Sequence, residues 1–361
     1  MFLTRRTFVK YVVALIGKFV TVLCGVTACR RSRLSPRQPS SGKAARSYRR
    51  ICTREEANDP AYIHLWCNGE LQARTQYLWD QLSACRLCPN RCATNRHIGR
   101  KGRCKADHEM VIHTMYPVYA AHQTWPAQPP SALITFSNCP LSCVFCKNWD
   151  ASQKSVGKIY GLTESAIALL HLQNIGCSSV RLNMPTPYLP HILSALSIAI
   201  ENGFRLPLHY RTSGYENAEV LSLLAGIVDV YQCNLLIADS AGAQELMGPC
   251  PQYPAVLHRA LMEMHRQTGP SLFTPAGKLR RGISFEHTVL PQNTARGELH
   301  LKWLRKHIGT NMPLRLNGTY QPAYQAINHP AIARRVHSHE LSRLVQTAKQ
   351  LGFSNVSVDG T

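Results

Sequence analysis

Acidic residues are scarce in this chain of 361 residues. There are 20 Asp and Glu against 41 Lys and Arg, which gives a net charge of +21, and residues 1–50 contain no Asp or Glu at all. Twelve of the basic residues lie in those first fifty positions, so 29 basic and 20 acidic residues leave the rest of the chain with a net charge of only +9. Because much of the basicity belongs to an N-terminal tail, the composition argues against a nucleic-acid partner.

Charged residues and polar low-complexity tracts are also sparse. Charged residues make up only 17% of the chain, and no long polar low-complexity tract follows residue 50. This composition excludes a largely disordered protein. An apolar content of 45% is enough to bury a large core, so we expect one large globular domain or two smaller ones.

The first residues have the pattern of an export signal or a membrane anchor. TRRTFVK (4–10) pairs two arginines before a phenylalanine, and an apolar run over 11–28 follows. This arrangement resembles a twin-arginine signal. VTAC (26–29) resembles the box that precedes the lipid-modified cysteine of bacterial lipoproteins. We therefore interpret residues 1–28 as a twin-arginine-like signal or an uncleaved membrane anchor. A cytosolic protein with an unusual N-terminus is the alternative.

Positive charges within and just after this segment oppose its translocation. Lys18 interrupts the apolar run, and three arginines follow the segment at once (Arg30, Arg31 and Arg33). Basic residues at such positions favour the cytoplasmic side of a membrane. Residues 29–60 are rich in Ser, Pro and Arg in their first two thirds and predict a flexible basic linker.

Short apolar runs alternate with longer amphipathic segments from residue 129 onward. They predict strands over 131–136, 179–184, 206–210, 227–232, 282–290, 313–318 and 354–358, and helices over 163–176, 189–203, 216–226, 253–269, 294–309 and 338–352. This order is typical of right-handed βαβ units around a buried parallel sheet. Six such repeats predict an α/β fold, a partial (β/α)6-type TIM-like barrel over 129–361. A doubly wound sheet is the alternative, and in either fold ligands bind at the carboxyl ends of the strands.

The fourteen cysteines fall into two tight groups and seven scattered positions. The N-terminal cysteine set is Cys85, Cys88, Cys92 and Cys104, and the cysteine triad is Cys139, Cys143 and Cys146. Neighbours so close rarely have room for independent disulfides, so both groups favour metal binding. Most of the other seven are predicted to be ordinary small apolar side chains, in a protein that functions in a reducing environment. They are Cys24, Cys29, Cys52, Cys67, Cys177, Cys233 and Cys250.

The N-terminal cysteine set has the spacing C-x2-C-x3-C-x11-C. Its four thiolates can close a tetrahedral metal site, and Gly99 and Gly102 allow the turn that brings Cys104 back. We expect the segment 61–128 to be a Cys-rich N-terminal segment that holds structural zinc or an auxiliary iron–sulfur centre. Reduced thiols without a metal are the alternative, and His97 is expected to be a loop residue.

The cysteine triad, with the spacing C-x3-C-x2-C, lacks a fourth ligand nearby. Asn138, Lys147 and Asn148 are poor ligands for a metal that thiolates bind. Three thiolates suit an iron–sulfur cluster in which one iron is free of protein ligands. The triad directly follows the first predicted strand of the barrel, where ligand chemistry belongs, and Phe145 would shield the cluster.

This pattern resembles the signature of the radical S-adenosylmethionine (SAM) superfamily, and in particular the uncharacterised relatives of pyruvate formate-lyase activating enzyme. The resemblance runs from about residue 82 to the C-terminus. It rests on CRLCPNRCATNRHIGRKGRC (85–104), FSNCPLSCVFCKNW (136–149), MPTPYLPHIL (184–193), YRTSGYENAEVLSLLAGIVDVY (210–231), VLPQN (289–293) and YQPAYQA (320–326). It implies a [4Fe–4S] cluster on the triad whose free iron binds SAM, and cleavage of SAM to methionine and a 5′-deoxyadenosyl radical.

The resemblance also implies a set of SAM contacts at the strand ends. Asn183, Pro185 and Thr186 lie where the family's glycine-rich motif meets the amino group of SAM. Thr212, Ser213 and Gly214 would face the ribose or the carboxylate, and the stretch from His287 to Pro291 would flank the adenine. Turn chemistry alone also explains prolines and glycines at these positions.

Further implied partners are a protein substrate, such as a glycyl-radical enzyme, and a low-potential electron donor of the flavodoxin or ferredoxin type. Asn234 and Leu236 depart from the family's acidic-x-Lys pattern, and Glu286 and Gln292 stand where Arg and Gly are expected. The substrate chemistry is therefore open, and a non-catalytic, membrane-associated iron–sulfur or zinc protein is the alternative. Because SAM and low-potential electrons are cytosolic supplies, we expect a cytoplasmic or membrane-associated enzyme, with a periplasmic lipoprotein as the rival.

Overall fold

The structure, a computed structural model, describes residue 52 and residues 59–119, 129–248, 250–275 and 277–360. The predicted signal or anchor over 1–28, and all of the predicted linker except residues 52, 59 and 60, lie outside this part of the chain. Of the helices that the structure describes, none has the length and apolarity needed to cross a bilayer.

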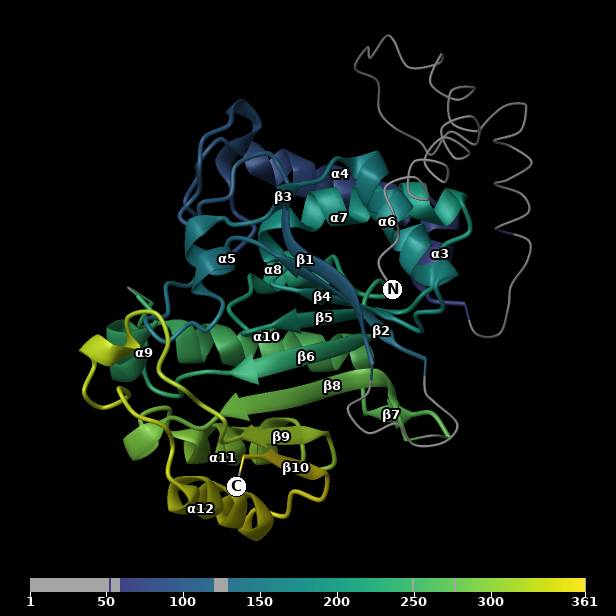
Figure 1. The fold of residues 1–361 in the computed structure, drawn as a ribbon. Helices are drawn as coiled ribbons and strands as arrows, with labels where there is room; N and C mark the ends of the chain where they lie inside the picture. Colours follow the sequence, from purple (N-terminus) through teal and green to yellow (C-terminus); the bar gives the residue numbers. More distant parts are fainter. Residues whose placement is uncertain (1–51, 53–58, 120–128, 249, 276, 361) are drawn as a thin grey trace, which may run out of the picture. The chain divides into compact units, whose positions relative to one another are not determined.

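A parallel sheet forms the centre of the molecule (Figure 1). Its strands lie side by side in chain order: β2 (Ser131–Phe136), β4 (Val180–Asn183), β5 (Leu208–Thr212), β6 (Val230–Leu235), β8 (Leu279–Thr288), β9 (Leu314–Asn317) and β10 (Val356–Asp359). A doubly wound sheet would reverse this order at a switch point. The uninterrupted order therefore confirms the partial (β/α) barrel.

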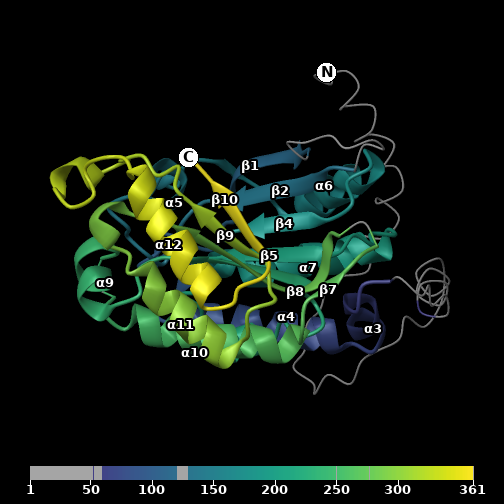
Figure 2. The ribbon, with the colours of Figure 1, turned by 90° about the horizontal axis from the view of Figure 1, so that it is seen from below.

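Six helices connect successive strands of this sheet. They are α6 (Leu162–Asn174), α7 (Leu189–Glu201), α8 (Ala218–Ser222), α10 (Tyr253–Thr268), α11 (Gly297–His307) and α12 (Ser338–Gln350). Right-handed crossovers that always advance in one direction place their helices on one face of the sheet, and Figure 2 shows α10 and α11 together on that side. The opposite face is left to line the interior of the barrel.

Apolar and polar side chains alternate along the strands as this arrangement requires. In β6, Tyr231, Cys233 and Leu235 are buried, whereas Gln232 and Asn234, which alternate with them, are half-buried. The same alternation occurs in β8, where the half-buried Glu286 follows the buried Phe285. Apolar residues therefore pack under the helices, and polar residues face the barrel interior.

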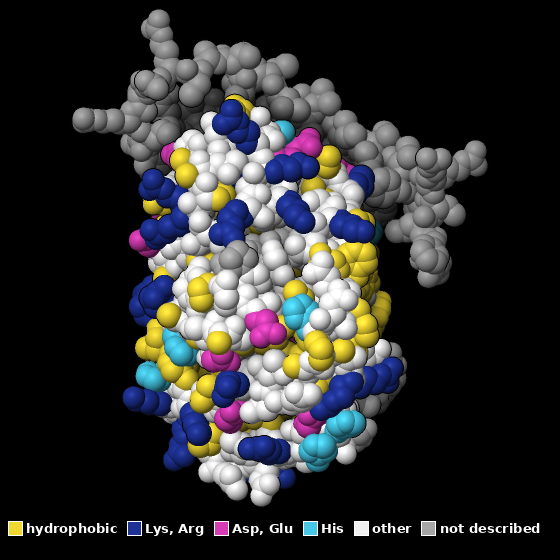
Figure 3. Space-filling view, turned by 90° about the vertical axis from the view of Figure 1, so that its left-hand side faces the viewer, with side chains coloured by type: hydrophobic (Ala, Val, Ile, Leu, Met, Phe, Trp, Pro, Cys, Tyr) yellow, Lys and Arg dark blue, Asp and Glu magenta, His cyan; other side chains and the backbone are white. Residues whose placement is uncertain are grey.

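The remaining elements extend the sheet or lie in the connections between its strands. They are α3 (Tyr62–Cys67), α4 (Glu70–Asp80), η2 (Gln81–Ala84), η3 (Arg96–Ile98), β1 (Val111–Val118), α5 (Trp149–Lys154), β3 (Lys158–Ile159), η4 (Thr186–Tyr188), α9 (Ser240–Leu246), β7 (Leu272–Phe273), η5 (Pro291–Asn293) and η6 (Ala326–Asn328). The pairings β1–β2, β1–β3 and β7–β8 are antiparallel. Figure 3 views the molecule from the side to which the parallel strands point, where Lys and Arg side chains outnumber acidic ones.

The Cys-rich N-terminal segment packs against the barrel. The Tyr62 hydroxyl donates a hydrogen bond to the carbonyl of Leu206 at 2.8 Å, and Trp79 Nε1 donates to Ser194 Oγ at 2.9 Å. Strand β1 of this segment joins the edge of the sheet through β2. The segment and the barrel therefore form one compact unit.

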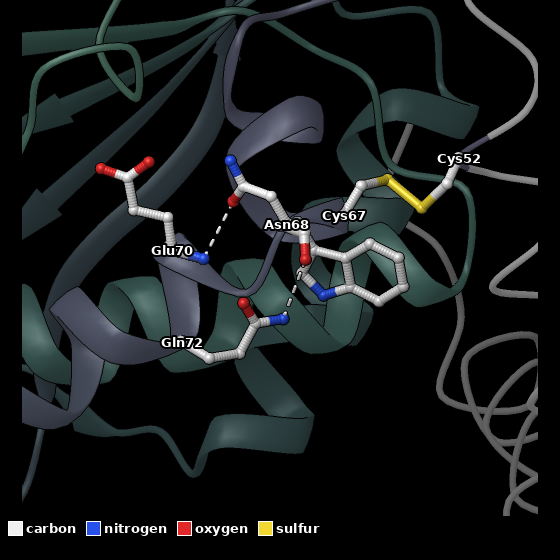
Figure 4. The surroundings of a disulfide bond; sticks show 6 residues. Cys52, Cys67, Asn68, Glu70 and Gln72 are labelled. Carbon is white, nitrogen blue, oxygen red and sulfur yellow. Dashed lines mark hydrogen bonds between the residues drawn. A yellow bond between two sulfur atoms is a disulfide. The ribbon is translucent and has the colours of Figure 1, made fainter. Parts of the chain in front are cut away.

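A disulfide corrects part of the interpretation of the scattered cysteines. Cys52 and Cys67 are bonded across 15 residues of sequence (Figure 4). The expectation that these two are unpaired small side chains was wrong, because helix α3 brings Cys67 back towards Cys52. Cys177, Cys233 and Cys250 are buried free thiols, as predicted, whereas Cys24 and Cys29 lie outside the described residues.

Candidate cofactor site

The cysteine triad lies on the loop between β2 and α5, at the carboxyl edge of the parallel sheet. The backbone N–H of Ser142 donates to the carbonyl of Met247 at 3.1 Å, and the N–H of Val144 donates to that of Leu246 at 2.9 Å. These two bonds attach the loop to the end of α9. The loop is therefore held in shape by the barrel, because its own residues form no regular structure.

Three other segments hold the carbonyl groups of the same loop. Asn90 Nδ2 donates to the carbonyl of Pro140 at 2.8 Å, and Gln153 Nε2 donates to that of Leu141 at 2.9 Å. The N–H of Gln325 donates to the carbonyl of Val144 at 2.9 Å. The N-terminal segment, α5 and the 320–326 stretch thus fix the positions of the three cysteines.

The three thiols fit a cluster of several metal ions. All three are free cysteines. Burial raises the pKa of Cys143 well above its ordinary value, and the neighbouring Cys139 and Cys146 raise it further. All three cysteines line the same cavity. In the described ranges, no three or more His, Cys, Asp or Glu side chains are arranged around one common metal position. Thiolates that each bind a different iron do not need to converge on one point, and clustered thiolates need compensating positive charge, which a cluster supplies.

A cavity of about 530 Å³ opens beside the triad. This volume lies within the usual range for a site that binds a small molecule or cofactor. The cavity is lined by the three cysteines and by five of the residues predicted to contact the cofactor: Phe145, Asn183, Thr186, Thr212 and Ser213. The ends of β4 and β5 therefore bring their predicted residues to the same cavity as the triad.

Two further predicted residues shape the cavity without lining it. Pro185 precedes the short helix η4, and Gly214 has φ +75° behind Ser213. A Cβ added at Gly214 would lie 2.2 Å from the side chain of Leu257, so only glycine fits there. Met184, between the predicted contacts Asn183 and Pro185, has φ +58° and itself lines the cavity. The turn after β4 thus has a left-handed backbone conformation even though no glycine is present.

His287 lies outside the cavity. It is buried, and its Nδ1 lies 2.8 Å from the carbonyl oxygen of Leu235, so this nitrogen carries the proton. A Cβ added at Gly297 of α11 would lie 2.5 Å from Nε2, which places the ring against that helix. Burial lowers the pKa of His287. Of the predicted stretch 287–291, Leu290 faces the cavity instead, as does Thr288.

Glu216 is a cavity residue that the sequence interpretation missed. Its side chain is buried and accepts hydrogen bonds from the hydroxyls of Thr212 at 2.5 Å and Thr186 at 2.9 Å. Burial raises the pKa of this carboxyl to about 7, although the hydroxyl hydrogen bonds oppose the shift. The spacing of four residues between Thr212 and Glu216 after a predicted strand was the available signal.

The positions that depart from the family pattern mostly border the cavity. Asn234, Leu236 and Glu286 are among its lining residues, and Glu286 forms an ion pair with Arg211 at 2.9 Å. Gln292 lies elsewhere, where its N–H donates to the Glu340 carboxylate at 2.6 Å. Asn234, Leu236 and Glu286 therefore form part of the wall of the cavity that the triad also lines.

The N-terminal cysteine set forms a second group of free thiols. The N–H of Cys85 donates to the carbonyl of Thr94 at 2.9 Å, which closes the turn over Cys88 and Cys92. A Cβ added at Gly102 would lie 3.4 Å from the Cys92 sulfur and 3.6 Å from that of Cys104, so the glycine lets the chain pass close to both thiols. Burial raises the pKa of Cys88 and of Cys104, and each is raised further by other thiols of the set. Thiols are the donor type that binds zinc and iron–sulfur centres, but in the part of the chain that the structure describes no three such side chains surround one metal position.

His97 is not part of this set. Its Nε2 lies 3.0 Å from the carbonyl oxygen of Trp79, and its ring stacks on the indole of the same residue. Asn90 lies between Cys88 and Cys92 and connects the two cysteine groups, because its Nδ2 donates a hydrogen bond to the carbonyl of Pro140 in the triad loop. Its Oδ1 accepts a hydrogen bond from the Tyr215 hydroxyl at 3.1 Å. The second group therefore also supports the first structurally.

No protein-family model matches the chain. It is 25% identical over 278 residues to the uncharacterized protein MJ0674 of Methanocaldococcus jannaschii, which covers 74% of each chain. Among solved structures, it is similar to Streptococcus suis SuiB bound to the precursor peptide SuiA (TM-score 0.42, 13% identity, 62% of this chain and 46% of that one). It is also similar to HydG, a maturase of the [FeFe]-hydrogenase (TM-score 0.41, 12% identity, 61% of this chain and 49% of that one).

A third similar structure is TYW1 with a lysine-pyruvate adduct bound (TM-score 0.37, 13% identity, 61% of this chain and 72% of that one). The part of the chain that matches SuiB and HydG spans about half the length of each of these two proteins. At these scores the likeness carries no argument about activity.

Proposed function

We propose that this protein is a radical SAM enzyme, in which the cysteine triad holds a [4Fe–4S] cluster and the adjoining cavity holds SAM. The observation that carries the proposal is a loop with three free thiols that is held by four other segments and lines a cavity of about 530 Å³. This loop follows the first parallel strand of a partial (β/α) barrel, where such folds place their chemistry.

When bound, the cluster supplies the electron that cleaves SAM to methionine and a 5′-deoxyadenosyl radical. The protein's own residues orient SAM and exclude water. The hydroxyls of Thr186 and Thr212 and the carboxylate of Glu216 form one hydrogen-bonded group beside the triad, suited to binding the amino group or ribose hydroxyls of SAM. Asn183 and Ser213 extend this polar wall, and Phe145 adds an apolar side chain to it.

We infer a second metal centre at the N-terminal cysteine set. Its four thiols, together with Gly99 and Gly102, form a closed turn that Asn90 and Asn217 attach to the barrel. Thiolates bind both zinc and iron–sulfur centres, but no three side chains of the described residues converge on one metal position, as a single zinc ion would require. In either case its role is to hold the segment that supports the triad loop.

The partners follow from this chemistry. We infer a low-potential electron donor of the flavodoxin or ferredoxin type, and a substrate from which a hydrogen atom is removed, such as a peptide or a glycyl-radical enzyme. Because SAM and such donors are cytosolic, the proposal places the enzyme in the cytoplasm or at the cytoplasmic side of a membrane.

Spectroscopy of the anaerobically reconstituted full-length chain tests the proposal. Reduction should give the electron paramagnetic resonance spectrum of a [4Fe–4S]⁺ cluster, and addition of SAM should change this spectrum because SAM binds the free iron. A cluster spectrum that does not respond to SAM would support instead a non-catalytic iron–sulfur protein.

A further inference from the structure

A second cavity of about 560 Å³ lies deeper in the barrel than the first. The two cavities share several lining residues, which are Lys147, Arg211, Asn234, Glu286, Asn317 and Thr319. They are therefore two parts of one space, the first beside the triad and the second along the inner face of β4, β5, β6, β8, β9 and β10. The residues proposed to bind SAM belong to the first part only.

Cations outnumber acids on the walls of this deeper cavity. Its lining holds Lys147, Arg181, Arg211 and Arg315, but only Glu286 and Asp359 as acids. Glu286 forms an ion pair with Arg211 at 2.9 Å, and Asp359 forms an ion pair with Arg315. Lys147 and Arg181 have no ion pair with any residue that the structure describes.

Arg181 is the more enclosed of these two cations. It lies on β4 and is half-buried, and both burial and the neighbouring Arg211 guanidinium lower its pKa. A guanidinium that is partly removed from water, beside a second guanidinium and without a carboxylate, is costly unless an anion pairs with it. The protein maintains this charge facing an open cavity.

The neighbours of Arg181 add no negative charge. His209 precedes Arg211 by two residues on β5 and is buried, and burial together with Arg181 and Lys278 lowers its pKa to about 3. Lys278 itself is bonded to a neutral partner, the Ser178 hydroxyl, at 2.7 Å. The charge on Arg181 is therefore compensated neither by its own strand nor by the next one.

We propose that the deeper cavity binds an oxyanion of the substrate, a carboxylate or a phosphate, with Arg181 as its main contact and Arg211 and Lys147 beside it. Guanidinium groups bind both oxyanions through paired N–H donors. This inference rests on the proposed function, because it names the substrate class for the same site. It places the anionic end of the substrate in the barrel and the reacting end towards the triad.

Binding of simple oxyanions to the full-length, iron-reconstituted chain tests this proposal. Malonate serves as the carboxylate probe and inorganic phosphate as the phosphate probe, each measured by isothermal titration at constant ionic strength. Wild type should bind at least one of them, and Arg181→Gln should weaken that binding at least tenfold. Arg343→Gln makes the same change of charge on the exposed face of α12 and should leave binding unchanged.

A second measurement uses only the wild-type protein, so its result does not depend on whether the Arg181→Gln variant folds correctly. Modification of arginines by phenylglyoxal, mapped by peptide mass spectrometry on wild type, should be slowed at Arg181 by the bound oxyanion but not at Arg343. The proposal is overturned if wild type binds neither probe, if Arg181→Gln binds as wild type does, or if Arg181 is not protected. A wild type that binds the oxyanion but whose cluster ignores SAM would refute the proposed function alone.

Discussion

At the residue scale, Glu216 explains how two strand ends act as one surface. Thr186 follows β4 and Thr212 ends β5, and each donates its hydroxyl to the same buried carboxylate. Neither hydroxyl is free to rotate while it is bonded in this way. The orientation of the polar wall beside the triad therefore depends on a buried carboxylate that itself lines the cavity.

Glu216→Gln should weaken SAM binding about tenfold, or about 1.4 kcal/mol. Both hydroxyls donate to the same carboxylate oxygen. An amide oxygen lacks the negative charge of a carboxylate and is a weaker acceptor for both of them, so the variant holds the two hydroxyls less firmly. Equilibrium dialysis of SAM against the reconstituted chain measures the effect. Glu219→Gln changes an exposed carboxylate three residues later, on α8, and is the matched control. Equal affinity in both variants would contradict the role of Glu216.

Cys139→Ser should abolish the iron–sulfur cluster on the triad, because two thiolates cannot hold it. This loss is measured as the iron and sulfide content of the reconstituted protein and as the visible absorbance of the sulfur-to-iron charge-transfer band. Cys177→Ser removes a thiol that is also buried and free but lies far from both groups in sequence. Equal loss of the triad's cluster in both variants would show that the triad is not its ligand set.

The sequence predicted the triad residues better than the residues around them. A spacing of C-x3-C-x2-C on one loop requires no tertiary information, so the three thiols come together as expected. His287 could not be placed, because a strand residue faces either the interior or the helices and a shift of one position decides which. Glu216 was missed because its partners lie on two different strand ends.

At the element scale, helix α12 is fixed to the strand-end turn η5 by one carboxylate. Glu340 accepts hydrogen bonds from the backbone of His337 and of Gln292, and it forms an ion pair with Arg334. The first of these bonds belongs to a capping box at the start of the helix. Arg334, followed by the two backbone N–H groups, lowers the pKa of Glu340 to about 2.

Glu340→Gln should lower the free energy of unfolding by about 1 to 2 kcal/mol at pH 7. A carboxyl whose folded pKa lies below its unfolded value stabilises the fold above the unfolded pKa, and this contribution is lost as pH falls towards 2. The difference between variant and wild type should therefore shrink below about pH 4. Urea unfolding across pH measures it, and Glu109→Gln, an exposed carboxylate, should show no such trend.

The main elements of the barrel were predictable because each strand and helix has its own period of apolar residues. The expected strand over 131–136 coincides with β2, and the expected helix over 189–203 contains α7. Strand β1 and helix α9 were not predicted. The first pairs antiparallel through contacts distant in sequence, and the second is a short helix in a long connection, where local pattern is weak.

At the scale of the whole molecule, the N-terminal segment and the barrel are one folded unit. Helix α3 packs against the barrel through Tyr62, and the disulfide ties Cys52 to that helix. The order of the parallel strands, which excludes a doubly wound sheet, is also a property of this scale. Periodicity alone left both folds open, since it identifies strands but not their neighbours in the sheet.

Reduction of the disulfide should destabilise the protein by up to about 3 kcal/mol, because a cross-link over 15 residues restricts the unfolded chain. Thermal unfolding with and without dithiothreitol measures the effect on wild type. The double variant Cys52→Ser, Cys67→Ser should melt at the reduced wild-type temperature and should not respond to dithiothreitol. A response of equal size in the double variant would locate the redox-sensitive bond elsewhere.

Cleavage of SAM tests the central claim of this account most directly. The full-length chain, reconstituted anaerobically with iron and sulfide and reduced in the presence of SAM, should release 5′-deoxyadenosine. Cys139→Ala should release none, whereas Cys177→Ala should behave as wild type. No 5′-deoxyadenosine from wild type that carries its cluster, or an equal amount from Cys139→Ala, would contradict the assignment of this fold and its cysteine triad to radical SAM chemistry.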